Sequence, residues 1–159
     1  MLHGSGKKID KAVKNNIKDL NIMKTKKCLT LADAKIIAAG CESEALSGGK
    51  AVTIAIVDDG GHLIFLQRLD GAPLISMEIA IGKARTSALA RKPSKFYMDR
   101  INNDEAAVLS LPGNLTCMEG GEPIIIDGEC IGAVGVSGVT AAEDAFIARA
   151  GISSLTNSL

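Results

Sequence analysis

The fold is decided by residues 112–138, PGNLTCMEGGEPIIIDGECIGAVGVSG. The β-branched run at 124–126 favours a strand, and the Asp127-Gly128 dipeptide after it suits the positive φ angles of a type I′ hairpin turn. Residues 130–136 predict the returning strand, which contains two glycines. Glycines inside a strand mark a bulge or the close approach of another backbone or a ligand. The stretch therefore predicts a central hairpin with either a ligand or a packed helix beside it.

Helix and strand patterns continue on both sides of this hairpin. The expected elements, in order, are helix 31–47, strands 52–57 and 62–69, helices 74–90 and 95–103, and helix 141–155. Thr30 and Thr140 stand where helix N-caps are needed. Two antiparallel hairpins with helices packed on their faces predict an α+β layered domain. Hairpin connections argue against a parallel nucleotide-binding sheet.

The helix at 74–90 has the longest helical pattern. Its expected core face is Leu74, Met77, Ile81, Ala84, Ala88 and Leu89. Lys83 and Arg85 do not share a face of this helix, so one of them is expected to face a pocket or a subunit boundary. Residues 104–121 are expected to be irregular, with a strand near 115–118. A connection of this length in a compact domain is often functional.

Composition excludes several classes of partner. The 159 residues include three Phe, one Tyr and no Trp, which argues against the aromatic platforms that bind single-stranded nucleic acid. The formal net charge is zero, so no overall field directs the chain to nucleic acid or to a membrane surface. No apolar run reaches membrane-spanning length. The four cysteines form no Cys-x-x-Cys pair, so free thiols in a reducing cytoplasm are expected.

The first 27 residues differ from the rest, because they hold eight lysines and only two aspartates. Their apolar residues recur at helical spacing, at Ile9, Val13, Ile17 and Leu20. The sequence thus predicts a basic amphipathic helix in an extension, 1–27, ahead of a domain at 28–159. Two interpretations stay open: the extension docks on the body or is unstructured, or residues 7–20 bind a partner.

His62 is the only histidine after the extension. It starts a strand directly after two glycines, where space beside it would suit an axial ligand to haem iron. The alternative is an ordinary surface or capping histidine. A second axial ligand could come from Met77, Met98 or Met118, which equally suit the filling of a core.

The Gly-Val-Ser-Gly turn at 135–138 precedes the last helix, so Ser137 and free backbone N–H groups there could hold an anion. The alternative is a packed strand-to-helix turn. It is not a P-loop, since no Gly-Lys-Ser/Thr follows. Cys117 as a nucleophile would need His62 as its base. Acidic residues such as Asp70 and Glu119 lie at turns, where carboxylates commonly make local hydrogen bonds.

Four segments together resemble a known family. They are AIVDDGGHLIFLQRLDGAP (55–73), IAIGKARTSALARKP (79–93), GGEPIIIDGECIGAVGVSG (120–138) and the run from Ala-Ala-Glu-Asp to Ala-Arg-Ala-Gly (141–151). Over roughly residues 28–155 the pattern resembles the GlcG/HbpS-like family, also described as the PduO C-terminal-domain family and formerly a domain of unknown function. The resemblance implies profilin-like α/β/α layers around a five-stranded antiparallel sheet, with the fifth strand in 113–121.

The resemblance also implies a homo-oligomer, a dimer, tetramer or octamer. Family members are linked to haem binding, iron or redox sensing and corrinoid metabolism, and to glycolate, diol or glycerol pathways. A ligand-binding accessory protein for haem, a corrinoid or a small metabolite is the leading expectation. The candidate ligand-binding residues are His62, Asp70, Gly71, Lys83, Glu119, Gly120, Gly121, Pro123 and Ser137, with His62 as the candidate haem ligand.

Two other functions stay open. One is a small-molecule enzyme in which Lys83 or Glu119 transfers a proton in a pocket beside Gly120-Gly121. The other is an assembly or cargo protein of a metabolic pathway or microcompartment, docking through residues 7–20. The sequence assigns no catalytic residue. Adenosyl transfer is not expected, because the chain has no adenosyltransferase motifs.

Overall fold

The computed structural model describes residues 25–159. Its elements in chain order are α2 (Leu31–Ser47), β1 (Thr53–Asp58), β2 (Leu63–Arg68), α3 (Ser76–Ala90), α4 (Lys95–Asn102), the 3-10 helix η1 (Ala106–Ser110), β3 (Gly121–Ile126), β4 (Glu129–Ser137) and α5 (Ala141–Thr156). The helix expected at 31–47, both hairpins and the last helix are confirmed. The basic helix expected within 1–27 lies outside the described residues, so the division at residue 28 stays a prediction.

One antiparallel sheet organises the chain, with strand order β2-β1-β4-β3. Its two middle strands are the buried ones, and β3 lies at an edge. The hairpin at 112–138 therefore supplies one central strand and one edge strand. Asp127 and Gly128 have φ angles of 51° and 80°, as the expected type I′ turn requires.

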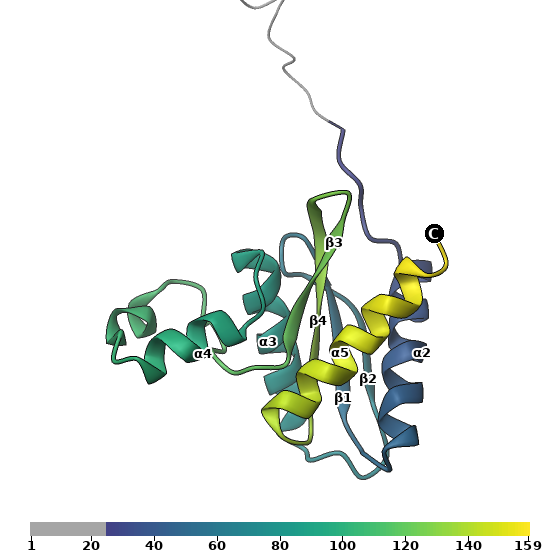
Figure 1. Ribbon diagram of the computed structural model, residues 1–159, viewed down its shortest axis with the longest axis horizontal. Coiled ribbons are helices and arrows are strands. Elements are labelled where there is room, and N and C mark those ends of the chain that lie inside the picture. The colour runs from purple at the N-terminus through teal and green to yellow at the C-terminus, as the bar shows by residue number, and fades with distance from the viewer. Residues whose placement is uncertain (1–24) are drawn as a thin grey trace, which may run out of the picture.

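Helices cover both faces of the sheet, which gives the expected α/β/α layering (Figure 1). Branched side chains fill the face under α2 and α5, where Ile37, Ile147, Ile54 and Val134 belong to one buried cluster. Alanines fill the face under α3. None of the helices in the described residues combines the length and the apolarity that crossing a bilayer needs.

The core face expected for α3 is confirmed at Ala84 and Ala88 and wrong at Leu74 and Leu89. Leu74, which is 78% exposed, lies outside the helix, and Leu89 is also exposed. The buried stripe consists mainly of small residues and extends through Ala80, which the sequence pattern does not assign to it. The reason is Gly135 of β4, where a Cβ atom would overlap the Ala80 carbonyl oxygen. The helix backbone lies directly on the strand, so large side chains do not fit between them.

The expected fifth strand is also wrong, because residues 113–120 form no strand and the described sheet has four. Asn114 (φ 52°) and Gly120 (φ 120°) leave the extended region that a strand needs. The Thr116 amide donates to the Thr86 hydroxyl of α3 (2.8 Å) instead of to a neighbouring strand. Residues 113–120 are therefore attached to α3 and do not add a strand to the sheet.

Candidate functional site

A buried ion pair joins α3 to α5. Lys83 lies in the middle of α3 and is 1% exposed. Its Nζ atom lies 2.7 Å from Oδ2 of Asp144, in the first turn of α5, and 3.1 Å from the carbonyl oxygen of Val136. The other carboxylate oxygen of Asp144 accepts a hydrogen bond from the Val139 amide (3.2 Å). Both charges are thus paired and hydrogen-bonded, the condition under which buried charges are tolerated.

Burial raises the pKa of the Asp144 carboxyl, and the Lys83 ammonium opposes that rise. The carboxylate is therefore a better proton acceptor than an exposed aspartate, although its charged form is held by the lysine. Breaking such a pair leaves an uncompensated buried charge.

Gly120 and Gly121 allow the backbone to run close to the Lys83–Asp144 ion pair. A Cβ atom at Gly120 would lie 2.8 Å from Lys83 Nζ and 2.8 Å from Asp144 Cβ. A Cβ atom at Gly121 would overlap the carbonyl oxygen of Lys83. The glycines at the start of β3 therefore mark close packing against a helix that carries a buried charge.

A cavity of about 220 Å³ lies beside the ion pair. Its apolar walls include Ile75, Ile79 and Met118. Its polar lining comes from Lys83, Asp144, Ser76 and Ser137, together with the start of α5. We call this space the Lys83 cavity.

Four of the sequence-predicted residues meet here: Lys83 and Ser137 line the cavity, and Gly120 and Gly121 pack against Lys83. One of Lys83 and Arg85 is expected to face a pocket or a subunit boundary, and Lys83 is the one that belongs to the lining of this cavity. Whether the four residues bind a ligand stays a prediction.

Other predicted residues lie nearby but outside the lining. The Asp70-Gly71 pair belongs to a turn just ahead of Pro73, which does line the cavity. Glu119 pairs with Lys95 of α4 (3.5 Å). Pro123 lies on the edge strand β3, where its missing N–H is tolerated.

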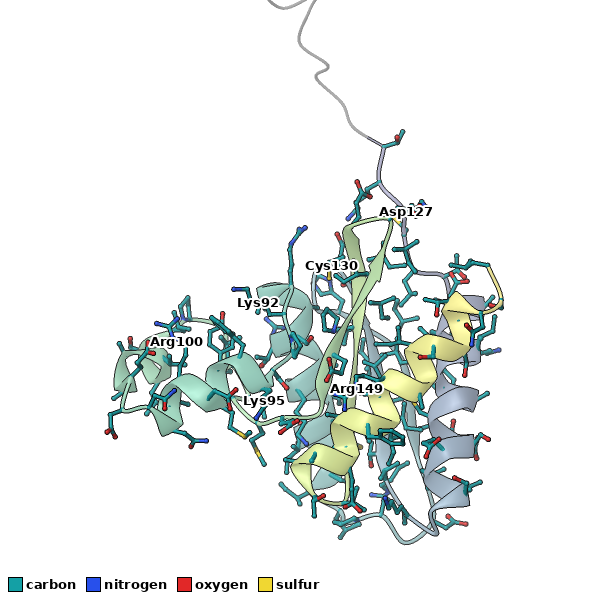
Figure 2. The ribbon with its side chains drawn as sticks, viewed as in Figure 1. Lys92, Lys95, Arg100, Asp127, Cys130 and Arg149 are labelled. Carbon is teal, nitrogen blue, oxygen red and sulfur yellow. The ribbon has the colours of Figure 1, made fainter. Side chains whose placement is uncertain are left out.

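A second buried carboxylate, Glu122 of β3, lies near Glu119. It accepts a hydrogen bond from Arg149 of α5 (2.8 Å), and burial raises the pKa of its carboxyl. Figure 2 shows Arg149 on α5 and Lys95 on the projecting α4 segment. Among residues 25–159, no three histidine, cysteine or acidic side chains gather into a group that could hold a metal ion.

His62 is not brought to the Lys83 cavity within one chain. Thr53 at one end of β1 pairs with Ser137, and Asp58 at the other end pairs with Gly132. The turn that carries His62 follows Asp58, so the length of β1, about 16 Å, separates it from the cavity. The sequence-predicted site is thus divided between opposite ends of the sheet.

The His62 imidazole is 77% exposed, and its Nδ1 atom lies 3.2 Å from Oδ2 of Asp58. Beside it, a Cβ atom at Gly61 would lie 3.1 Å from Cγ of Arg85 and 3.5 Å from Cγ of Leu89. Leu89 and Leu63 are both exposed. We call His62, Leu63, Arg85 and Leu89 the His62 surface.

Sequence reasoning missed Asp144 as a site residue, although a signal was present. Lys83 stands in the small-residue stripe of α3, next to Ala84. Asp144 stands on the buried stripe of α5 that continues through Ala148 and Gly151. Opposite charges on the buried stripes of two helices indicate that they pair, because an isolated buried charge is too unfavourable.

Comparisons with known proteins agree with the fold and identify the family. A family model described as "Haem degrading protein HbpS-like" matches residues 29–153. The chain belongs to the HbpS-like family. This confirms the resemblance seen in the sequence.

Protein GlcG of Escherichia coli K12 is 45% identical to this HbpS-like chain over 115 residues, which cover 72% of the chain and 85% of GlcG. The crystal structure of Klebsiella pneumoniae protein ORFY has a TM-score of 0.80 at 28% identity, covering 86% of this chain and 97% of ORFY. The crystal structure of a PduOC–haem complex has a TM-score of 0.75 at 25% identity, covering 80% of this chain and 95% of PduOC.

Proposed function

We propose that this HbpS-like chain is a haem-binding accessory protein in which His62 is an axial ligand of the iron. The observation that carries the proposal is the contact between His62 Nδ1 and the Asp58 carboxylate (3.2 Å). Metal-binding histidines usually donate their other ring N–H to a carboxylate or carbonyl oxygen, which fixes the tautomer and the ring. That arrangement leaves Nε2 for iron.

The rest of the His62 surface fits the other parts of haem. Leu63 and Leu89 are exposed and would contact the apolar porphyrin. Arg85, whose Cγ atom lies against the Gly61 backbone, would pair with a propionate carboxylate. When bound, the haem would supply a redox-active iron. Because the surface is open, a haem there stays accessible on one side unless a second copy covers it.

The relatives support haem over the alternatives. The family description names haem degradation, and PduOC was crystallised with haem. A corrinoid rests on the sequence resemblance alone, so we restrict the proposal to haem.

The test is a haem titration of the purified chain followed in the Soret band. We expect a shifted Soret band that His62→Ala abolishes, whereas His3→Ala, which removes the other histidine, leaves it unchanged. Asp58→Asn should weaken binding about 10–100-fold, because the ring loses its orienting acceptor. Unchanged binding in His62→Ala would overturn the assignment of the ligand.

We further propose that the protein self-associates in the cytoplasm and serves a glycolate, diol or glycerol pathway. Support for self-association comes from exposed apolar side chains on the projecting segment at 95–118, namely Phe96, Leu109, Leu111 and Met118 (Figure 1). Helix α4 in this segment has no buried residue.

All four cysteines carry free thiols, which suits a reducing compartment. Docking through residues 7–20 lies outside the described residues and stays a prediction.

A further inference from the structure

We propose that the Lys83 cavity binds a small uncharged aldehyde or ketone, and that Lys83 forms a reversible imine with it. This site lies at the opposite end of the sheet from His62, so the inference goes beyond haem binding and does not depend on it.

The first support is the state of the Lys83 amine. Its side chain is buried, and Lys83 is one of the residues that line the cavity. An ammonium group has three N–H bonds, and the described residues supply two acceptors, Asp144 and the Val136 carbonyl. One N–H of the ammonium therefore has no acceptor among the described residues.

The second support is charge balance. Lys83 and Asp144 neutralise each other, and most of the remaining wall is apolar. An anionic ligand would add an uncompensated negative charge beside the Asp144 carboxylate, and the repulsion between the two charges disfavours it. An uncharged ligand with one polar group avoids this penalty.

The third support is size. An apolar cavity of about 150 Å³ binds benzene, so a cavity of about 220 Å³ suits a compound of about that size. Haem is far too large for it. The cavity thus selects a small molecule and is separate from the proposed haem surface.

The fourth support is a set of donors for a carbonyl oxygen. Ser137 lines the cavity and is 6% exposed. Within the described residues, the side-chain hydrogen bonds around the Lys83 cavity involve Lys83, Asp144 and Ser76. None of them involves the Ser137 hydroxyl. Ala141, the first residue of α5, also lines the cavity. Its amide belongs to the first turn, where N–H groups have no intrahelical acceptor and the helix dipole is positive.

These groups account for each proton in imine formation. The Asp144 carboxylate takes a proton from the Lys83 ammonium, and the free amine attacks the carbonyl carbon, forming the C–N bond. The carbonyl π electrons move to oxygen, which takes a proton from the newly bonded, positively charged nitrogen to give a neutral carbinolamine. The Asp144 carboxylic acid then gives its proton to that hydroxyl, which leaves as water while the nitrogen lone pair forms the C=N bond. The products are the protonated imine and an ionised Asp144. No oxidant or reductant is needed. The raised pKa of the Asp144 carboxyl assists the first transfer.

The test is reductive trapping with butanal, and with butanone as the ketone, in the presence of cyanoborohydride. Peptide mass spectrometry then gives the initial labelling rate of each lysine in the full chain. We expect Lys83 to be alkylated at least about tenfold faster than the exposed Lys35 of α2, because a positioned amine beside a bound carbonyl reacts at high effective concentration. Equal rates, or slower labelling of Lys83, would overturn the proposal.

Variants separate chemistry from structure. Lys83→Arg keeps a cation beside Asp144 but cannot form an imine, so no label should appear at position 83. Ser137→Ala should slow labelling of Lys83 and leave Lys35 unchanged; an unchanged Lys83 rate would contradict carbonyl recognition by this hydroxyl. Butyrate should not compete with butanal, and competition by the anion would contradict the charge argument.

The comparison of Lys83 with Lys35 within the unmodified chain decides the outcome even if a variant does not fold. His62→Ala should leave the labelling rate of Lys83 unchanged. Failure of haem binding and failure of imine formation are therefore distinguishable.

Discussion

Gly120 shows at the scale of one residue how a missing side chain positions the candidate site. Its φ angle of 120° is one that L-residues with a Cβ rarely adopt, and the space a Cβ would fill is taken by the ends of Lys83 and Asp144. Substitution therefore disturbs both the backbone and the ion pair.

Gly120→Ala should lower the free energy of unfolding by about 2–4 kcal/mol, through backbone strain and overpacking. Gly128→Ala is the matched control, since Gly128 also has positive φ but nothing lies within 4 Å of the position that a Cβ atom would take there. We expect the control to lose only about 1 kcal/mol from strain. Urea unfolding measures both, and equal losses would contradict the packing argument.

Lys83→Met should cost about 3–5 kcal/mol at neutral pH, because it leaves the Asp144 carboxylate buried and unpaired. The loss should shrink as the pH falls. Burial raises the folded-state pKa of Asp144 above its unfolded value, so its contribution to stability is present at low pH and is lost as the pH rises through the folded pKa. Chemical unfolding between pH 4 and pH 8 tests this, and a loss that grows toward low pH would contradict it.

How much of the site is predictable from sequence is also clearest at single residues. Lys83, Gly120 and Ser137 can be found because they stand in motifs that are local in sequence. Asp144 escapes notice because its role depends on a partner 61 positions away, and only the burial of both helices shows that the two charges must meet. His62 is grouped with them because a motif does not say at which end of a strand its turn lies.

At the scale of elements, α5 begins at a capping box that the sequence shows plainly. The Glu143 carboxylate accepts hydrogen bonds from the Thr140 hydroxyl (2.6 Å) and amide (3.1 Å), and it pairs with Lys50 (2.9 Å). These contacts lower the pKa of Glu143 to about 2, the Thr140 hydroxyl having the largest effect.

Glu143→Gln should therefore remove part of the acid sensitivity of the fold. A carboxyl with a lowered folded pKa stabilises the protein above its unfolded pKa, and that stability is lost as the pH falls through the folded value. The free-energy difference between the parent and Glu143→Gln should thus be constant above about pH 5 and shrink between pH 4.5 and about 2. Glu42→Gln on α2 is the control. A difference that does not change over this window would contradict the capping role.

The helix α3 shows where sequence patterns fail at this scale. Periodicity predicts its bounds within two residues but only part of its buried face: Ala84 and Ala88 are buried, whereas the large apolar Leu89 is exposed. The opposing surface is made by Gly135 and Ala133, and that information lies in a distant part of the chain. Small residues are therefore the buried ones.

At the scale of the whole molecule, the layer order follows from hairpins and helix periodicity, which are local signals. The number of strands does not, because the segment before β3 contains strand-like residues whose backbone is turned by positive φ angles. The proposed self-association rests only on the pattern of exposed apolar side chains.

Leu109→Asp, on the projecting segment, should lower the molar mass measured by light scattering if this segment mediates self-association. Leu109 is 71% exposed, so the charge should not affect folding. Leu46→Asp on α2, where the leucine is 61% exposed, is the control and should leave the mass unchanged. Unchanged mass in both variants would contradict the proposed role of the segment.

The contact between α3 and β4 has a consequence for how the protein tolerates sequence change. On the α2–α5 side, branched side chains can repack when one of them changes size. On the α3 side, backbone meets backbone through alanine and glycine, so there is no side-chain layer to absorb added volume. A saturation library should therefore accept several apolar residues of similar volume at Ile37 and almost none at Gly135, which makes the first face the one to redesign.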